Sequence, residues 1–458
     1  MNCYLAVPTL LLATAIGLAQ PGSLVGYEHI GSMESGEIET VLNIAFGMDA
    51  PTSTYSISMY SITYEIQTSD GTTDTLSGAV AFPHDPTRAF PIASYQHGTT
   101  ILDNNVPSIT GLSADNLEIT LIAMIAGSNG FITGFPDYIG LGISDGYHPY
   151  IIADPYTLAV MNLIRAIKHL AFEIDPIESF QWNNQLYLFG YSEGGYATMA
   201  AQKGIEESLL DELPITASFP MAGPYDLSGT MVDYFLSIPS YPQPYYVPNV
   251  LFNHLDYYGS LDDLDQYFLP VWADTLPILF DGTYAGWEIN DLMPENPLDI
   301  LLPEVLDEFI ANEEHFFRLT LAENTLLDWV PITPTYLIHG MGDDIVPYAN
   351  AEVAYIDFIS GGALDVTLIN FSESEGGHAE LALPCIFQAY EIMLQYQALS
   401  PKGDIDGDGD LSENDLELLA QSILNGSELG IFETWAGDWD YDGSHSIIDL
   451  TAISLSID

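Results

Sequence analysis

The sequence predicts an α/β protein with a mostly parallel sheet, helices on both faces, an inserted helical cap and a small C-terminal helical module. Three features indicate this. Strand-like and helix-like segments alternate after an antiparallel start. Residues 225–330 break the alternation with a run rich in Tyr, Phe, Trp, Leu and Pro, and from residue 401 aspartates recur at fixed spacing in a unit that occurs twice. We therefore expect a main domain at 20–400, with 225–330 as a cap over the sheet's carboxyl edge, and a module at 401–458.

The main domain begins with a predicted hairpin. Residues 54–67, TYSISMYSITYEIQ, are rich in Thr, Ile, Tyr and Ser with partial alternation. SDGTTD follows as a turn, and TLSGAVAFP is the return strand. Two such runs joined by a short turn favour antiparallel pairing.

Strands and helices then alternate along the chain. Buried strands are expected at 91–98, 131–137, 185–190, 215–223, 334–340 and 366–372. Helices are expected at 116–127, 154–173, 195–210 and 348–359, with a final helix ending near residue 399. The helix at 154–173 is amphipathic, because its apolar residues fall on one face: Leu158, Met161, Leu163, Ile164, Ile167 and Leu170.

The charge balance is extreme. The chain has 458 residues, with 6 Lys and Arg against 65 Asp and Glu, and a net charge of −59. A surface this acidic repels phosphate backbones and anionic lipid head groups, which argues against nucleic-acid binding. We interpret the excess as a halophilic adaptation to high salt or calcium-bearing seawater, where counter-ions screen self-repulsion.

The first residues predict export. An apolar run extends from Tyr4 to Leu18, and the small residues Gly17 and Ala19 precede Gln20 as a cleavage site. This is typical of a secretory signal peptide at 1–19, although its start carries no Lys or Arg. The run is too short to span a membrane comfortably, and we expect no membrane span elsewhere. A secreted, extracellular protein is therefore predicted.

The two cysteines predict no disulfide in the mature protein. Cys3 lies within the predicted signal peptide and would be removed with it. Cys385 is then alone, within the apolar run LALPCIF, and is predicted to be a buried core residue.

Two stretches contain G-x-S-x-G, namely GYSEGG at 190–195 and GISDG at 142–146. A nucleophile elbow needs a strand that ends abruptly, a strained residue, and a helix that starts at once. Around Ser192, QLYLF is the strand, flanking glycines leave room, and YATMAAQKGIEESLL continues as a helix. Ser144 instead lies in the glycine-rich loop DYIGLGISDGYHPY, where Pro149 disfavours a helix. We predict that Ser192 is the nucleophile and Ser144 a decoy.

A serine hydroxyl needs a neighbouring base that is oriented by an acid. LIHGMGDDIVP ends a strand in a loop that carries Asp343 and Asp344. After the next strand, FSESEGGHAE carries His378 in a glycine-flanked loop. Both loops emerge at the same edge of the sheet as Ser192, so we predict that His378 is the base and one of the two aspartates the acid.

The other histidines of the main domain are interpreted differently. His339 lies within a predicted buried strand and reads as a core histidine. The positions of His148, His254 and His315 indicate no role.

The tetrahedral transition state of acyl transfer carries an oxyanion and needs preorganised donors. One predicted donor is the backbone N–H of Glu193, directly after the serine. The other is the backbone N–H of Thr99, in the sequence QHGTT after the 91–98 strand. The His97-Gly98 pair is typical of an oxyanion hole at that strand.

Together these motifs resemble an α/β-hydrolase of the secretory lipase/esterase type. The resemblance rests on SYQHGTT, DYIGLGISDGYHPY, FGYSEGGYA, HGMGDDIVP and GGHAE, and covers about residues 50–400. It implies the α/β-hydrolase fold with an inserted cap, and cleavage of carboxylic esters through an acyl-enzyme. In many hydrolases that read G-x-x-D-x-x-V-P, the acid lies three residues before the valine. Val346 thereby selects Asp343 and leaves Asp344 as a solvated loop acid.

The aromatic and apolar cap suits a fatty or aryl acyl group, so we expect a lipid or aryl ester as substrate and no cofactor for catalysis. Two alternatives stay open. One is a serine peptidase or aminopeptidase of the same fold, in which Glu313 and Glu314 would bind a substrate amine. The other is a binding module with a vestigial triad.

The tail contains two twelve-residue loops, DIDGDGDLSEND at 404–415 and DWDYDGSHSIID at 438–449. Each places oxygen ligands at positions 1, 3, 5, 7, 9 and 12, with a glycine at position 6 for the sharp turn, which is the spacing that wraps one calcium ion. The predicted calcium ligands are Asp404, Asp406, Asp408, Asp410, Ser412 and Asp415 in the first loop, and Asp438, Asp440, Asp442, Ser444, Ser446 and Asp449 in the second, position 7 using its backbone carbonyl.

The tail is EF-hand-like, but each loop has Asp rather than Glu at position 12 and is followed by a single helix-like run, LELLAQSIL or LTAISLSI. This resembles a dockerin, a module that plugs an enzyme into a cohesin-bearing scaffold. The resemblance implies a cohesin-like scaffold protein as partner. The last helix is short, and the alternative is a calcium-stabilised appendage that anchors or terminates the protein.

Overall fold

The computed structural model describes residues 21–47, 50–68, 71–175, 179–427 and 429–457. The predicted signal peptide at 1–19, with Cys3, lies outside these residues. In the described part of the chain, no helix combines the length and hydropathy that crossing a bilayer requires.

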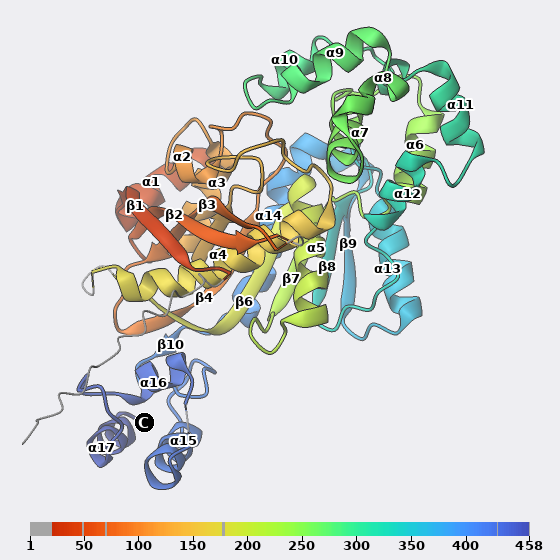
Figure 1. The fold of residues 1–458 in the computed structure, drawn as a ribbon. Helices are drawn as coiled ribbons and strands as arrows, with labels where there is room; N and C mark the ends of the chain where they lie inside the picture. The colour runs from red at the N-terminus through yellow and green to blue at the C-terminus, as the bar shows by residue number, and fades with distance from the viewer. Residues whose placement is uncertain (1–20, 48–49, 69–70, 176–178, 428, 458) are drawn as a thin grey trace, which may run out of the picture.

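Strands of the described residues form one large sheet (Figure 1). Its order is β1-β2-β3-β5-β4-β6-β7-β8-β9, and β10 pairs with β4. The strands are β1 (Leu24–Met33), β2 (Ile57–Gln67), β3 (Thr73–Pro83), β4 (Arg88–Gln96), β5 (Ile132–Pro136), β6 (Gln181–Tyr191), β7 (Ala217–Met221), β8 (Thr335–Gly340), β9 (Val366–Phe371) and β10 (Ser400–Pro401). Along this order, neighbouring strands from β1 to β5 pair antiparallel. The neighbours from β5 through β4 and β6 to β9 pair parallel.

Helices cover both faces of the sheet, as predicted. On one face lie α4 (Ala153–Glu173), α5 (Glu193–Ser208) and α13 (Ala349–Gly361). The other face carries α1 (Ser35–Phe46), α3 (Leu117–Ile122), the π-helix η2 (Ala123–Gly127) and α14 (His378–Tyr396). Cys385 of α14 is fully buried, which confirms its predicted place in the core.

Residues between β7 and β8 form a helical insertion beyond the carboxyl ends of the central strands (Figure 1). Its helices are η3 (Leu227–Met231), α6 (Val232–Ser237), α7 (Tyr246–Tyr258), η4 (Leu261–Asp263), α8 (Leu264–Tyr267), α9 (Pro270–Leu279), α10 (Gly286–Asn290), η5 (Pro297–Ile300), α11 (Pro303–Ala311) and α12 (Phe316–Glu323). We call this insertion the cap. Short turns elsewhere are α2 (Pro107–Thr110) and η6 (Glu373–Glu375).

The tail forms α15 (Glu413–Asn425), α16 (Ile431–Gly437) and α17 (Ile447–Ser456) at the opposite end of the sheet from the cap (Figure 1). Besides the chain connection, strand pairing and apolar packing join the tail to the sheet. β10 pairs with Arg88 and Ala89 at the start of β4, and Ala89 packs against the tail's apolar core. The tail thus shares hydrogen bonds and buried surface with the amino-terminal edge of the sheet.

Several elements were not predicted. β1 lies at the edge of the sheet, has no fully buried residue and has two register shifts. Its sequence therefore lacks the alternation of apolar and polar residues that would have predicted a strand. α1 was likewise missed. The predicted helix at 116–127 is α3 followed directly by the π-helix η2. The helix predicted to start at Gly195 begins at Glu193, and the last helix ends at Tyr396.

Two glycines test how tightly the first turn of α5 is packed. Gly194 and Gly36 each lie second in their helix, α5 and α1. A Cβ on Gly194 would lie 1.9 Å from the Gln96 carbonyl oxygen, whereas a Cβ on Gly36 would meet nothing within 4 Å. We expect Gly194→Ala to lower the free energy of unfolding by about 1–3 kcal/mol or more. Gly36→Ala should be neutral or stabilise by up to about 1 kcal/mol. Chemical denaturation measures both, and equal effects would contradict the packing.

Candidate functional site

Ser192 occupies a strained turn between β6 and α5. β6 ends at Tyr191, α5 begins at Glu193, and Ser192 between them has φ 62° and ψ −122°. Its backbone N–H donates to the Met221 carbonyl of β7 at 2.9 Å. A positive φ is costly for a non-glycine residue and persists only where the surroundings impose it. The geometry is that of a nucleophile elbow.

The structure brings Ser192, His378 and Asp343 together in a hydrogen-bonded row. Ser192 Oγ lies 2.8 Å from His378 Nε2, and His378 Nδ1 lies 2.6 Å from Asp343 Oδ2. The carboxylate can only accept, so Nδ1 donates to it and Nε2 is left to accept the serine proton. This is the arrangement of nucleophile, base and orienting acid. The catalytic roles of the three residues stay predictions.

Asp343 is held as an anion by four donors. The backbone N–H groups of Ile345 and Val346 donate to its Oδ1 at 2.9 and 2.7 Å. Burial alone would raise the pKa of Asp343, but hydrogen bonds from His339 and His378 outweigh burial and hold the pKa of this carboxyl well below its usual range. The acid therefore stays ionised over the range in which His378 would act as a base.

The structure also separates the two candidate aspartates. Asp344 does not bind the ring of His378; its Oδ1 accepts from the His378 backbone N–H at 3.1 Å. Asp344 is exposed, as the sequence predicted for a solvated loop acid, and it also supports the start of α14, which carries His378.

His339 was interpreted as a core histidine, and it is fully buried in β8. It does more than fill the core. Its Nε2 lies 3.1 Å from Asp343 Oδ2 and 2.9 Å from the Val346 carbonyl. Both partners are acceptors, so Nε2 carries a proton and donates to the carboxylate. The four-residue separation of His339 and Asp343 was the only sequence signal of this contact.

The two predicted oxyanion donors lie at the start of α5 and in the loop after β4. Glu193 starts α5, where unpaired N–H groups and the helix dipole favour negative charge. Thr99 follows β4, and its hydroxyl lies 3.0 Å from the Tyr150 hydroxyl. The donor role of Thr99 stays a prediction.

The second G-x-S-x-G has a different local structure. The Ser144 hydroxyl accepts from the Gly140 backbone N–H at 3.1 Å, within a loop. No helix follows Ser144 before α4. The loop nevertheless carries His148, whose Nε2 lies 2.9 Å from Oε1 of Glu193, the residue after Ser192.

A cavity of about 100 Å³ opens at Ser192 and extends into the cap. Apolar side chains make up most of its wall. They include Leu227 and Phe235 from the first cap helices, Leu251 from α7 and Phe317 from α12. The cavity joins the row of hydrogen-bonded side chains to an apolar compartment.

The two tail loops share most of their internal hydrogen bonds. The carboxylates of Asp404, Asp406 and Asp408 come within 4.8 Å of one another, as do those of Asp438, Asp440 and Asp442. At position 12, Asp415 and Asp449 are buried and accept from the backbone N–H groups of Ser412 and Ser446, each at 2.8 Å. At position 7, the N–H groups of Asp410 and Ser444 donate to the position-5 carboxylates at 2.9 and 2.8 Å.

These residues fit a divalent cation. Asp404 and Asp415 are both fully buried, and burial raises the pKa of Asp404 to about 6. Buried like charges so close together are costly unless a proton or a cation compensates them. Oxygen ligands in this number and spacing are what calcium prefers.

Comparison with known proteins identifies the fold. No family model and no curated protein matches the sequence. Among solved structures, a Legionella pneumophila protein assigned provisionally to the hydrolases is 29% identical, with a TM-score of 0.73 over 81% of this chain and 98% of that one. The rice cell wall degrading esterase LipA from Xanthomonas oryzae is 25% identical in a ligand-bound form, with a TM-score of 0.70 over 82% and 97%.

Candida antarctica lipase A in its closed state is 18% identical, with a TM-score of 0.59 over 82% of this chain and 84% of that one. At this identity the likeness concerns the fold alone. Together with the mixed sheet flanked by helices, these matches show that the chain has the α/β-hydrolase fold, and they support a hydrolase.

The two aspartates give a matched test. Asp343→Asn should leave the His378 ring in the wrong tautomer and lower kcat by roughly 10³–10⁴-fold. Asp344→Asn keeps an oxygen that accepts from the His378 backbone, so kcat should fall far less. Steady-state kinetics with an activated ester compares them. Equal losses would contradict the distinction between the two carboxylates.

Proposed function

We propose that this protein is a secreted serine carboxylester hydrolase that cleaves hydrophobic, neutral esters through an acyl-enzyme on Ser192. The observation that carries the proposal is the Ser192–His378–Asp343 row at the mouth of an apolar cavity. The likeness to the esterase LipA, at 25% identity, supports the same reaction class.

In the proposed mechanism, Ser192 Oγ attacks the ester carbonyl carbon while His378 Nε2 takes the hydroxyl proton. The carbonyl oxygen becomes an oxyanion, which the backbone N–H groups of Glu193 and Thr99 stabilise. His378 then returns the proton to the leaving alcohol, and the acyl group stays on Ser192. A water molecule repeats the sequence, with His378 as base, and releases the carboxylic acid.

The cavity supports an apolar acyl group. Its wall offers dispersion contacts and few polar partners, so a charged or strongly polar acyl group would lose hydration without replacement. The net charge of −59 further disfavours anionic substrates. A fatty or aryl ester meets both conditions.

The peptidase alternative receives less support. Glu313 and Glu314 are exposed between α11 and α12 and do not line the cavity. Glu193 does line it, but its carboxyl is already bonded to His148 and Tyr156. Aminoacyl p-nitroanilides separate the two functions, because a peptidase would cleave them at rates comparable to esters.

An ester chain-length series tests the proposal. We expect kcat/KM for p-nitrophenyl esters to rise by about fourfold for each added methylene until the cavity is filled, since each buried methylene contributes about 0.8 kcal/mol. Ser192→Ala should lower kcat by roughly 10⁴-fold or more while leaving the unfolding temperature nearly unchanged. Turnover retained in Ser192→Ala would refute the assignment.

We also propose that the tail binds two calcium ions. Asp404, Asp406, Asp408 and Asp415 would hold the first, with the Asp410 carbonyl and Ser412, and the corresponding residues of 438–449 the second. The ions would neutralise clustered carboxylates and rigidify both loops. The repeated hydrogen-bond pattern of the loops supports this proposal.

Calcium binding is tested by calorimetry on two neighbouring variants. Asp408→Ala removes a side-chain ligand and should weaken binding at one site by at least about tenfold. Asp410→Ala keeps its backbone carbonyl and should bind as the unaltered chain does. A chelator should lower the unfolding temperature of the tail. Equal affinity of both variants, or no heat of binding, would contradict the proposed ligand set.

For the tail's partner, we propose a cohesin-like scaffold protein. Ile447 and Ile448 at the start of α17 are 65% and 60% exposed, an apolar pair that a protein surface could cover. Calorimetry with a purified cohesin tests this. Absence of binding in calcium would favour the alternative of a calcium-stabilised appendage.

The proposed extracellular location rests on the sequence of residues 1–19 and on the acidic surface. N-terminal sequencing of exported protein should find a start near Gln20. Activity that persists in molar salt and fails in dilute buffer would support the proposed adaptation to salt.

A further inference from the structure

Glu193, which follows the nucleophile, carries a carboxyl group that the proposed reaction does not use. Its side chain is 2% exposed. Its Oε1 accepts from the Tyr156 hydroxyl at 2.9 Å and lies 2.9 Å from His148 Nε2. Tyr156 belongs to α4, and His148 to the loop that contains the decoy serine. The loop and the first turn of the helix that follows it therefore both hold the Glu193 side chain beside Ser192.

The hydrogen bonds of His148 show why the carboxyl is tolerated there. His148 Nδ1 lies 2.8 Å from the Ile139 carbonyl, which can only accept, so Nδ1 carries a proton. The bond to Glu193 then needs one more proton, either on Nε2 or on the carboxyl. In both cases the pair is neutral as a whole. An uncompensated carboxylate here would repel the oxyanion that forms next to it.

The same loop also holds the other side of the predicted oxyanion hole. The Tyr138 hydroxyl donates to the His97 carbonyl at 3.0 Å. The Tyr138 ring packs against the His97 ring at 4.3 Å and the His148 ring at 5.7 Å between centroids. The Tyr150 hydroxyl lies 3.0 Å from Thr99 Oγ1. Both predicted donors are therefore fastened to residues of one segment, 138–156.

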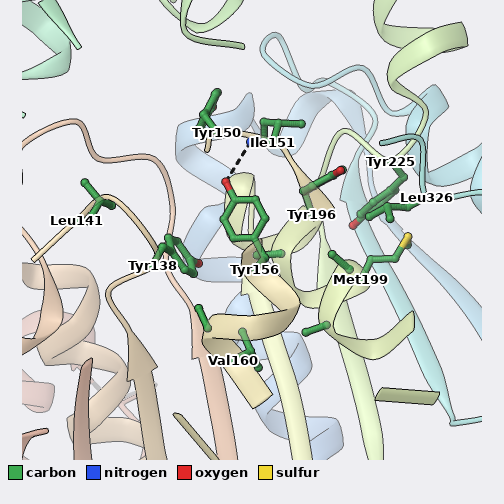
Figure 2. Close-up of a cluster of buried hydrophobic side chains, with 14 of the residues drawn as sticks. Tyr138, Leu141, Tyr150, Ile151, Tyr156, Val160, Tyr196, Met199, Tyr225 and Leu326 are labelled. Atoms are coloured by element: carbon green, nitrogen blue, oxygen red, sulfur yellow. Dashed lines mark hydrogen bonds between the residues drawn. The ribbon is translucent and has the colours of Figure 1, made fainter. Parts of the chain in front are cut away.

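The backbone of this segment is itself fixed. Tyr138 and Ile151 have φ of 75° and 58°, which non-glycine residues adopt only when their surroundings require it. The Ile151 N–H donates to the Tyr156 hydroxyl at 3.1 Å, the bond marked in Figure 2. Figure 2 shows Tyr138, Tyr150 and Tyr156 gathered where the loop meets α4. The Tyr156 hydroxyl thus joins the loop backbone to Glu193.

We propose that His148 and Tyr156 are positioning residues that hold the Glu193 backbone N–H toward the oxyanion, and that Tyr138 and Tyr150 hold the Thr99 segment opposite. The inference rests on the proposed function, since it assigns these residues to its transition state. It gives the second G-x-S-x-G stretch a purpose: the glycine-rich loop delivers His148 to the elbow.

The test compares His148→Phe and Tyr156→Phe with Tyr64→Phe. Tyr64 is also buried and donates one hydrogen bond to α4, to the Ala159 carbonyl at 3.1 Å, but is not among the residues that contact the elbow. It therefore controls for losing a buried hydroxyl. Titration with an irreversible phosphonate counts the reactive serines, so that kcat refers to folded enzyme.

We expect His148→Phe and Tyr156→Phe to lower kcat per titrated serine by about 10–100-fold with little change in KM. A trifluoromethyl ketone, whose adduct with Ser192 carries an oxyanion, should bind more weakly by the same factor. Tyr64→Phe should change neither quantity. Glu193→Gln should lower kcat less than Glu193→Ala, because the amide can still bond to His148 or Tyr156. Glu193→Ala should behave like His148→Phe.

The inference is overturned if kcat per titrated serine and ketone affinity in His148→Phe and Tyr156→Phe match those of Tyr64→Phe. A loss confined to the number of titratable serines would also overturn it, because that is a folding effect. Failure of the proposed function looks different: Ser192→Ala would then retain turnover, and the phosphonate would not label Ser192.

Discussion

The carbonyl oxygens of Gln96 and Met221 approach the first turn of α5 so closely that only glycine fits at residues 194 and 195. This contact ties the ends of β4 and β7 to the helix that follows β6. Ser192 is held between them at a backbone conformation that it would not choose alone. Since β8 and β9 are parallel to β6 and β7, the loops bearing Asp343 and His378 open at the same edge, and the hydrogen-bonded row depends on that shared edge.

The site contains buried carboxyl groups, which need hydrogen-bond donors, in a chain that has few basic side chains. There are two such groups near Ser192. Glu193 follows Ser192 in the chain, and Asp343 belongs to the hydrogen-bonded row. Each is paired with histidine: Asp343 with His378 and His339, and Glu193 with His148. A histidine ring N–H can donate to a carboxylate, so both carboxyl groups are paired without lysine or arginine, of which the whole chain has 6.

The two proposed activities lie at opposite edges of the sheet, one at the carboxyl ends of the parallel strands and the other at their amino ends. Ser192 follows β6 at the carboxyl edge of the sheet, and the cap lies beyond this edge, where ester cleavage is proposed. The amino edge carries β10 and the tail, where calcium binding is proposed. Only two residues separate Asp404 from β10, so ordering the first loop would act on a segment already paired with β4. The tail is therefore in a position to stabilise the sheet without approaching the site.

Much of this could be read from local patterns. Alternating apolar segments gave the parallel strands and helices, and the glycines around Ser192, with the strand before and the helix after, distinguished it from Ser144. The order of strands placed His378 and Asp343 at one edge, because parallel strands end together. The contacts of His148 with Glu193 and of His339 with Asp343 were not readable, and neither was the edge strand β1. The contact of His148 with Glu193 joins segments 45 residues apart and leaves no pattern in the sequence, and the four-residue separation of His339 and Asp343 does not by itself identify a contact. Both contacts are decided by tertiary packing, which determines the acceptor that lies within reach of each histidine ring.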